Sequence, residues 1–445
     1  MLVFTACFAV PRSVPPASAE PPSAPGTIAA ADSAGSAIDL GPTSAAPWNP
    51  PHAIPAHETW EQVLNAPLTL VSLPFRALGA LSEAGLLRVQ EDHLVPRVQY
   101  GLTYNRFGVG VGPGGLGDRT GLGAALRFEP PRLRGWLRAS LAGSMSHYHR
   151  GRVELGRPWL FAGYTYDWRP QEPFFGLGPN TSEGDVSDFA MQSQRAELQL
   201  RLRAGTKLRH EVGAWVGERQ SVLRSGRERT RPSIETAFPQ LAAGALNVEQ
   251  HHVVTGARAA LDTRSGHPHW ARGWRIGAQA ERFGDARSNG LLFPDAGSSP
   301  GFNRFTLGCQ AGWSFMRDPR TLRLGARVVD IRPFDPAQPP MPFDLSHLGG
   351  RAGLAGFETG RFHGLDLLVV NLGYIFPLTQ YAELELATEL GSVSDDLWHE
   401  TRLDGLEHSY SVMFRPRSKT APLGAIGVSW SREATRVRVS LGGVE

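Results

Sequence analysis

The chain has 445 residues, of which 41% are hydrophobic and 20% are charged, and its net charge is +3. This balance gives no electrostatic reason to expect nucleic acid as a partner. Beyond the extreme N-terminus there is no run of about 18 or more apolar residues, so the sequence excludes a membrane-spanning helix. The two cysteines, Cys7 and Cys309, are too few for a disulfide framework.

The first residues predict an export signal. Leu2–Val10 forms an apolar core, and Ala17-Ser18-Ala19 fits a small-residue cleavage site, so we expect a signal peptide over residues 1–19. A lipoprotein signal ending at Cys7 is the alternative. Residues 20–57 are rich in Pro, Ala and Ser and cannot bury enough apolar surface to offset their ordering entropy. They are therefore predicted to be a disordered linker.

Residues 58–90 predict the one convincing amphipathic helix of the chain. Trp60, Val63 and Leu64 begin an apolar stripe at helical spacing, and the stripe continues past Pro74. Two roles stay open for this helix. It packs against an apolar surface, or it plugs the domain that follows.

From Leu94 onward the hydrophobic pattern has a period of two. Small or branched apolar residues alternate with Arg, Glu, Gln and Ser. Successive side chains of a strand point to opposite faces, so each such segment has one apolar face and one polar face. The pattern is clearest in five segments: 137–144, 196–204, 275–281, 383–390 and 436–441.

Two kinds of fold show this alternation, a soluble sandwich with its apolar side inward and a membrane barrel with its apolar side outward. Many segments have about 10 residues, near the length that a tilted strand needs to cross a bilayer. They continue over roughly 350 residues, too many for one sandwich. Trp and Tyr, including Trp136, Trp159, Trp215 and Trp274, lie mostly near segment ends, as an interfacial girdle requires. We therefore predict an all-β fold, a closed antiparallel transmembrane β-barrel over residues 91–445.

The most distinctive stretch is Gly349–Leu378. Its first part, residues 349–364, contains six glycines, which permit backbone conformations that other residues avoid. Its second part is apolar at nearly every position, as in a strand buried on both faces. Four large side chains interrupt the glycines: Arg351, Phe357, Arg361 and Phe362.

Two further motifs precede this stretch. Phe174–Thr181 reads FFGLGPNT and includes Gly176 and Gly178. Leu261–Arg264 reads LDTR and is followed by Arg272-Gly273. The residues of this second motif that we single out are Asp262, Arg264 and Gly273.

In this order, the three motifs resemble those of the BamA-like bacterial surface-antigen barrels, which include the TamA-like proteins and the two-partner-secretion transporters. The resemblance implies an outer-membrane barrel of about 16 strands, in which the glycine-rich loop folds back into the lumen and about five strands follow it. In the family the loop tip reads Arg-Gly-Phe or Arg-Gly-Tyr, and its arginine anchors the loop to the barrel wall. Here the tripeptide is Ala355-Gly356-Phe357, so the arginine is missing.

The polar side of a later segment offers partners for a substitute anchor. We expect Arg351 or Arg361 to replace the missing arginine, because a guanidinium donates forked hydrogen bonds to carboxylates. The candidate partners on the wall are Glu383, Glu385 and Glu389.

For function, the resemblance implies insertion or translocation of protein or lipid at the outer membrane. Outer-membrane lipid is one expected partner. A separately encoded periplasmic protein or client is another, since residues 58–90 are too short for the folded periplasmic repeat domains of assembly factors. A passive, porin-like channel is the alternative.

The sequence predicts neither an enzyme nor a cofactor site. Histidine pairs such as His147 and His149 lack a carboxylate or thiolate set at metal-ligand spacing. Ser409 follows His408 directly, and neighbours on a strand point to opposite faces, so this pair is not arranged for proton transfer.

Overall fold

The computed structural model describes residues 107–441, apart from residues 114–115, 117–119, 122, 134, 205–209, 228–229, 243–244, 265–271, 286–298, 316–319, 380–381, 401–404 and 417–423. The predicted signal peptide, linker and N-terminal helix lie outside the described residues and stay predictions. Among the described helices, none has the length and hydropathy needed to cross a membrane.

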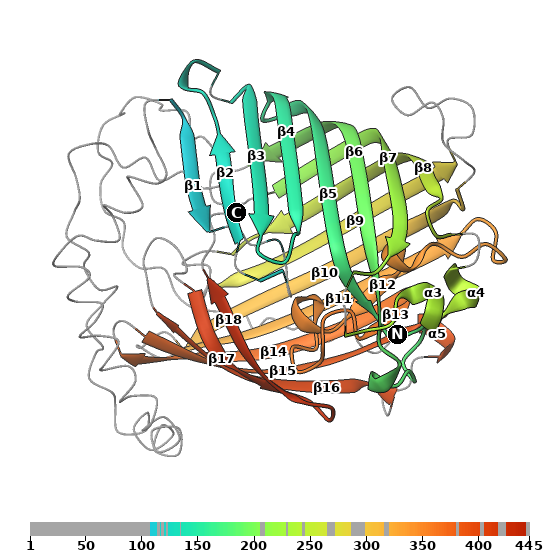
Figure 1. Ribbon diagram of the computed structural model, residues 1–445. Helices are drawn as coiled ribbons and strands as arrows, with labels where there is room; N and C mark the ends of the chain where they lie inside the picture. Colours follow the sequence, from blue (N-terminus) through green and yellow to red (C-terminus); the bar gives the residue numbers. More distant parts are fainter. Residues whose placement is uncertain are drawn as a thin grey trace, which may run out of the picture. The chain divides into compact units, whose positions relative to one another are not determined.

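Sixteen strands form one sheet in which each strand is antiparallel to the next strand along the sheet (Figure 1). The all-β class and the strand number predicted from the sequence are confirmed. Among the described residues no pairing joins β1 to β18, so closure of the barrel stays a prediction. The strands are β1 (Val109–Pro113), β2 (Gly123–Phe128), β3 (Leu137–Ser144), β4 (His149–Arg157), β5 (Leu160–Phe174), β6 (Ser187–Ala204), β7 (His210–Ser225), β8 (Glu249–Asp262), β9 (Gly273–Asp285), β10 (Phe302–Phe315), β11 (Arg320–Pro333), β14 (Asp366–Thr379), β15 (Ala382–Ser394), β16 (Glu407–Pro416), β17 (Gly424–Trp430) and β18 (Thr435–Leu441).

From β4 to β16, long and short connections alternate along the sheet. At one edge, which we call the loop end, residues 175–186, 226–248, 286–301, 334–365 and 395–406 join successive strands. At the opposite edge, the turn end, residues 158–159 join β4 to β5 and residues 380–381 join β14 to β15. Such an asymmetry is typical of outer-membrane barrels. Four connections at the loop end coincide with long polar stretches of the sequence: residues 224–242, 285–301, 332–347 and 392–407.

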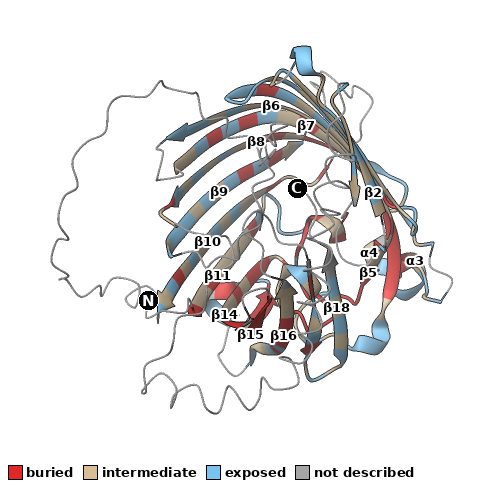
Figure 2. Cartoon of the chain, turned by 90° about the vertical axis from the view of Figure 1, so that its left-hand side faces the viewer, coloured by how far each residue is buried: buried red, intermediate tan, exposed pale blue. Residues whose placement is uncertain are grey.

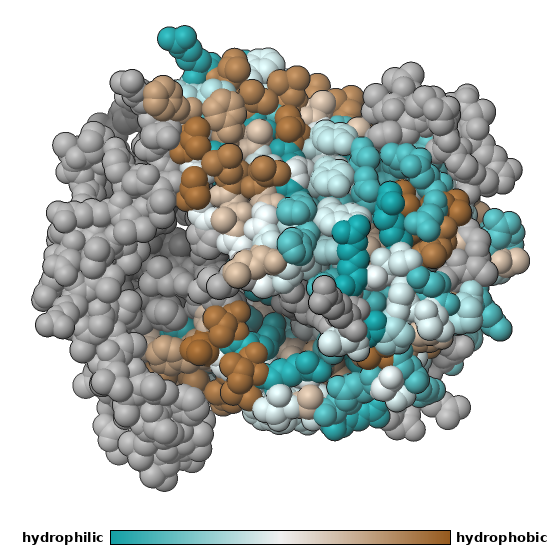
Figure 3. Space-filling model, viewed as in Figure 1, coloured by the Kyte–Doolittle hydropathy of each residue, from teal (hydrophilic) through white to brown (hydrophobic). Residues whose placement is uncertain are grey.

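The two faces of the sheet differ as the alternation predicts. On β6 the leucines at 198, 200 and 202 are 50%, 41% and 53% exposed. The opposite face is concave, because Arg195 of β6 lies 3.6 Å from Glu281 of β9 although β7 and β8 separate these strands. Exposed and buried residues alternate along the strands in Figure 2. Hydrophobic groups gather over parts of the strands in Figure 3, and hydrophilic groups gather toward the loop end.

Several aromatic side chains lie on the exposed face near strand ends, but one predicted member of the girdle does not. Trp136, Trp159 and Trp274 are about half exposed near the turn end. Trp215 is only 8% exposed and packs against Gly256, where an added Cβ would come within 2.3 Å of the indole. Its odd-numbered position on β7 places it on the concave face, so the girdle prediction was wrong for this residue.

The connection between β11 and β14, residues 334–365, has structure of its own. It contains the 3₁₀ turns η4 (Pro342–Asp344) and η5 (Gly350–Ala352) and two short strands, β12 (Ser346–Leu348) and β13 (Phe362–Gly364). These two strands pair with each other as a separate sheet. Five strands of the main sheet follow, as the resemblance implies. The remaining short elements are η2 (Pro131–Leu133), η3 (Glu183–Asp185), α3 (Ile234–Ala237), α4 (Pro239–Ala242) and α5 (Leu397–Glu400).

Candidate functional site

The glycine-rich loop, residues 349–364, packs on the concave side of β14 and β15. Phe357 and Phe362 are each 1% exposed, and their rings meet edge to face with centroids 5.2 Å apart. Burying a side chain of this size stabilises a fold by roughly 1.5–3 kcal/mol. The rings belong to a core cluster that also contains Leu348, Leu354, Leu367, Val369 and Val393.

The loop tip contacts the inner face of the sheet through its backbone. The N–H of Ala355 donates to Glu389 of β15 over 2.5 Å, and the N–H of Gly356 donates to the Ser409 hydroxyl of β16 over 2.6 Å. Ser431, in the turn between β17 and β18, donates to the Gly356 carbonyl over 3.1 Å. These three contacts fix the tip against three successive parts of the sheet.

Only glycine fits at position 356. A Cβ built there would lie 2.4 Å from the carbonyl carbon and oxygen of Trp430, and these backbone atoms cannot move independently of the strand. Such close approach of two backbones is a common reason for glycine. Leu354, two positions earlier, has a φ of +64° and is fully buried.

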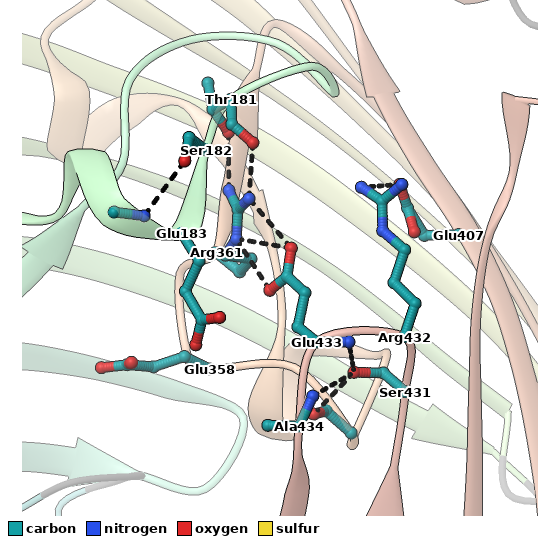
Figure 4. A network of polar contacts seen from close by, with 12 residues as sticks. Thr181, Ser182, Glu183, Glu358, Arg361, Glu407, Ser431, Arg432, Glu433 and Ala434 are labelled. Carbon is teal, nitrogen blue, oxygen red and sulfur yellow. Dashed lines mark hydrogen bonds and ion pairs between the residues drawn. The ribbon is translucent and has the colours of Figure 1, made fainter.

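Arg361 anchors the other end of the loop. Its guanidinium makes a forked contact with Glu433, with Nε 3.1 and 3.0 Å from the two carboxylate oxygens and Nη2 3.0 Å from one of them (Figure 4). It also donates to the hydroxyl and to the carbonyl of Thr181, over 2.6 and 2.5 Å. The rings of Phe175 and Phe362 lie 5.0 and 4.7 Å from the guanidinium carbon. Arg361 itself is 1% exposed.

The partner of Arg361 differs from the predicted set. Glu433 lies in the turn between β17 and β18, whereas all three predicted glutamates lie on β15. Glu385 instead holds Arg323 of β11 and Arg415 of β16 at 2.8 and 2.5 Å. Glu389 accepts from the loop backbone at Ala355. Glu383 is 2% exposed.

The other candidate anchor, Arg351, lies in η5 and borders a cavity between the loop and the sheet. The neighbouring carbonyl of Ala352 accepts a hydrogen bond from Arg327 of β11. A second buried ion pair holds the start of the connection, where Arg219 of β7 contacts Asp344 of η4 at 2.6 Å. The 334–365 connection is therefore fixed to the sheet at several separate points.

Two of the sequence motifs meet in this site. The N–H of Gly178 donates to the carbonyl of His363 over 2.7 Å, and the ring centroids of Phe174 and His363 are 5.0 Å apart. Thr181 of the same motif binds Arg361. The Phe174–Thr181 motif therefore forms the surface on which the C-terminal part of the glycine-rich loop lies.

The Asp262–Gly273 motif lies at the turn end, away from this contact. Arg264 donates from Nε and Nη2 to the two carboxylate oxygens of Asp262, over 2.9 and 2.8 Å. Gly273 has a φ of +115°, which disfavours other residues, and a Cβ there would meet the Thr263 carbonyl at 2.8 Å. The described residues of the motif lie where β8 ends and β9 begins.

Sequence reasoning missed Thr181 and Glu433. Thr181 is part of a motif singled out in the sequence, so its proximity to the loop was open to inference. Glu433 stands in a four-residue stretch between β17 and β18 that has no distinguishing pattern. Its partnership with Arg361 spans 72 residues and follows only from the curvature of the sheet.

Burial changes the titration of His363. This side chain is 5% exposed, and its burial, with His347 as a lesser cause, lowers its pKa to about 3. The imidazole is therefore neutral at neutral pH. The neutral ring avoids the cost of a charge in this buried place beside Phe174.

The described residues contain no group of three or more His, Cys, Asp or Glu side chains that could hold a metal ion. His408 is exposed and Ser409 is fully buried, so the two point to opposite faces as the strand pattern predicted. The main feature of the site is the glycine-rich loop, which a buried ion pair and backbone hydrogen bonds hold in place.

The fold and this loop define an all-β protein with a 16-stranded antiparallel sheet and an inward-folded connection. No family model matches the chain, and no curated protein matches it. Solved outer-membrane barrels are similar to it. BamA from Haemophilus ducreyi lacking POTRA domains 1–3 matches with a TM-score of 0.49 and 11% identity, over 75% of this chain and 68% of that chain.

Two CdiB structures are also similar. The Escherichia coli protein matches with a TM-score of 0.46 and 14% identity, over 75% of this chain and 62% of that chain. The Acinetobacter baumannii protein matches with a TM-score of 0.43 and 12% identity, over 75% and 58%. The chain thus spans less than two thirds of either CdiB.

Proposed function

We propose that the chain forms a closed barrel in the outer membrane and assists the insertion or translocation of protein or lipid there. The observation that carries this proposal is the glycine-rich loop, which is packed and anchored on the concave side of the sheet by Arg361 and the tip contacts. In a closed barrel this loop occupies part of the lumen. Closure would also pair the outer edges of β1 and β18, because backbone N–H and C=O groups need hydrogen-bond partners in a bilayer.

A loop fixed in the lumen favours a barrel that handles a client over one that conducts freely. The connection that contains the loop, residues 334–365, is held by at least two buried ion pairs, Arg361 with Glu433 and Arg219 with Asp344, and removing one partner of such a pair is costly. We further propose a separately encoded periplasmic partner or client that reaches the barrel from the turn end.

A passive channel is the second candidate. The concave face of β3–β9 carries partly exposed charges, such as Arg152 with Glu154 and Arg203 with Glu211, that suit a water-filled passage. Fold alone does not decide between these functions.

Two measurements on the purified protein separate the candidates. The first is conductance in planar bilayers, for the full chain and for a variant lacking residues 349–364. An anchored loop predicts low conductance that rises on deletion, whereas a channel predicts steady conductance already in the full chain. The second is the folding of a small unfolded outer-membrane barrel into liposomes that contain the protein. If the client barrel folds faster into liposomes with the wild-type protein than into empty liposomes, and Arg361→Ala removes this gain, the result supports an assembly function. Equal folding rates in empty liposomes, with wild type and with Arg361→Ala contradict it.

A further inference from the structure

A cavity of about 670 Å³ lies between the glycine-rich loop and the concave face of β14, β15, β16 and β18. This volume is within the range of small-molecule sites. The loop contributes Ala355, Phe357 and Thr359 to its lining. Small residues of the sheet, Gly373, Ala387 and Ser411, form part of the opposite side and leave the space open.

The lining of this cavity is rich in cations. Three glutamates border it, Glu358, Glu385 and Glu389, against six arginines, which leaves an excess of three positive charges. The arginines are Arg231, Arg323, Arg351, Arg415, Arg436 and Arg438.

All three glutamates already have donors. Glu358 lies 2.9 Å from Arg231, and Glu389 accepts from the Ala355 backbone. Glu385 is held between the arginines of β11 and β16. The three carboxylates of the cavity are therefore shared among several donors, with Glu358 also 3.8 Å from Arg436, and they balance only part of the charge of the six guanidinium groups.

Arg438 is the clearest of these remaining cations. It lies on β18 and, among the contacts of the described residues, makes no hydrogen bond or ion pair within 4 Å. Arg436, two positions earlier on the same face of β18, has its carboxylate neighbours Glu183 and Glu358 only at 3.7 and 3.8 Å. Two guanidinium groups thus border one cavity with donors available for a further acceptor.

The fixed position of the loop tip keeps this space from closing. Gly356 is fitted against the Trp430 backbone, so the tip cannot move toward the sheet there. Ala355 extends only a methyl group beyond its backbone. Asn371 and Ser411 add neutral hydrogen-bonding groups beside the arginines.

We propose that this cavity binds a phosphate-bearing anion, with Arg438 and Arg436 as its principal donors. Guanidinium groups bind phosphate oxygens in a forked geometry, and the interaction strengthens away from bulk water. The phosphate comes from a soluble molecule in the lumen or from a lipid headgroup that enters beside β18, the last strand of the sheet.

Binding of two probes to the detergent-solubilised full chain tests the proposal. Inorganic pyrophosphate represents the soluble source, and dihexanoyl phosphatidic acid represents the lipid source. The variants are Arg438→Gln and the matched control Arg203→Gln, which removes an arginine of the same concave face on β6. Folding of each variant is checked by heat-modifiable mobility on gels.

We expect at least one probe to bind wild type and the control about tenfold more tightly than Arg438→Gln, in line with the loss of one charge-assisted contact. The probe that shows the difference identifies the source of the phosphate. If neither probe binds, or if both variants bind each probe as wild type does, the proposal is wrong. A loss that is equal in Arg438→Gln and the control would also contradict it, because it would reflect only the general charge of the concave face.

Discussion

The two sides of the concave face use the same residue types with different consequences. On β6 and β7, Arg203 and Glu211 lie 3.0 Å apart and their side chains are 43% and 22% exposed. At the loop end, Arg361 and Glu433 form a similar pair that is 1% and 11% exposed, and the rings of Phe175 and Phe362 lie against its guanidinium. A hydrated pair contributes little to stability, whereas a buried pair becomes costly when one partner is removed. Burial by the loop, and not the charge pattern, therefore determines which pairs hold the structure.

The most disruptive test of this comparison is Arg361→Ala set against Arg203→Ala. Removing Arg361 leaves Glu433 and Thr181 without their donor in a buried place, and we expect a loss of roughly 3–5 kcal/mol in the free energy of unfolding. Arg203→Ala should cost less than about 1 kcal/mol. Urea unfolding from detergent micelles, followed by gel mobility, measures both. Similar losses for the two variants would remove the distinction between the two sides.

The outer face gives a second contrast, between neighbouring residues of β6. Leu200 is 41% exposed on the face that we assign to lipid, whereas Gln199 lies on the concave face and contacts Arg201. Leu200→Arg at mid-membrane should cost roughly 2–4 kcal/mol, and Gln199→Arg should cost little. Unfolding in lipid vesicles is the measurement. Equal tolerance of the two changes would mean that the faces are reversed.

Two glycine substitutions test whether the loop tip is closely packed on the sheet. Gly356→Ala places a methyl group against the Trp430 backbone and should cost roughly 1–3 kcal/mol, as overpacking does. Gly112 of β1 has no atom within 4 Å of its would-be Cβ, so Gly112→Ala is the matched control. Thermal midpoints in detergent compare the two variants. Equal thermal midpoints for Gly356→Ala and Gly112→Ala would mean that the loop tip does not pack closely on the sheet.

The last expected effect is a pH dependence from His363. Its pKa is lowered from about 6.5 to about 3 in the fold, so the unfolded chain binds the extra proton first and stability falls as pH drops below about 6.5. The loss is about 1.4 kcal/mol for each pH unit between these values. His363→Phe, beside Phe174, should flatten this part of the stability profile. An unchanged slope between pH 6.5 and pH 5 would assign the dependence to other groups.

Much of the fold follows from local pattern. The period of two fixes the exposed and concave faces of β6, because it depends only on side-chain direction along a strand. The burial of Trp215 on the concave face could not be predicted in this way. Interfacial and packed tryptophans look alike in sequence, and its small neighbour Gly256 lies on another strand.

The site was predictable only in part. Arg361, Phe357 and Phe362 could be chosen as loop anchors from their chemistry. The choice of Glu433 over the β15 glutamates depends on which distant turn the curved sheet brings to the loop, and the sequence contains no local signal for it. Glu385 was predicted as a wall partner for a loop arginine, but Arg323 of β11 and Arg415 of β16 hold it instead.

The central claim is that the glycine-rich loop lies inside the barrel, and its accessibility in intact cells tests this most directly. A single cysteine replaces Thr359 in the loop or, as a control, Leu177, which is 47% exposed in the connection between β5 and β6 at the loop end. Both variants carry Cys309→Ser and are treated with a bulky, membrane-impermeant maleimide. A loop held inside the barrel predicts rapid labelling of Leu177→Cys and protection of Thr359→Cys until Arg361 is also replaced by alanine. Labelling of Thr359→Cys as readily as Leu177→Cys would contradict it.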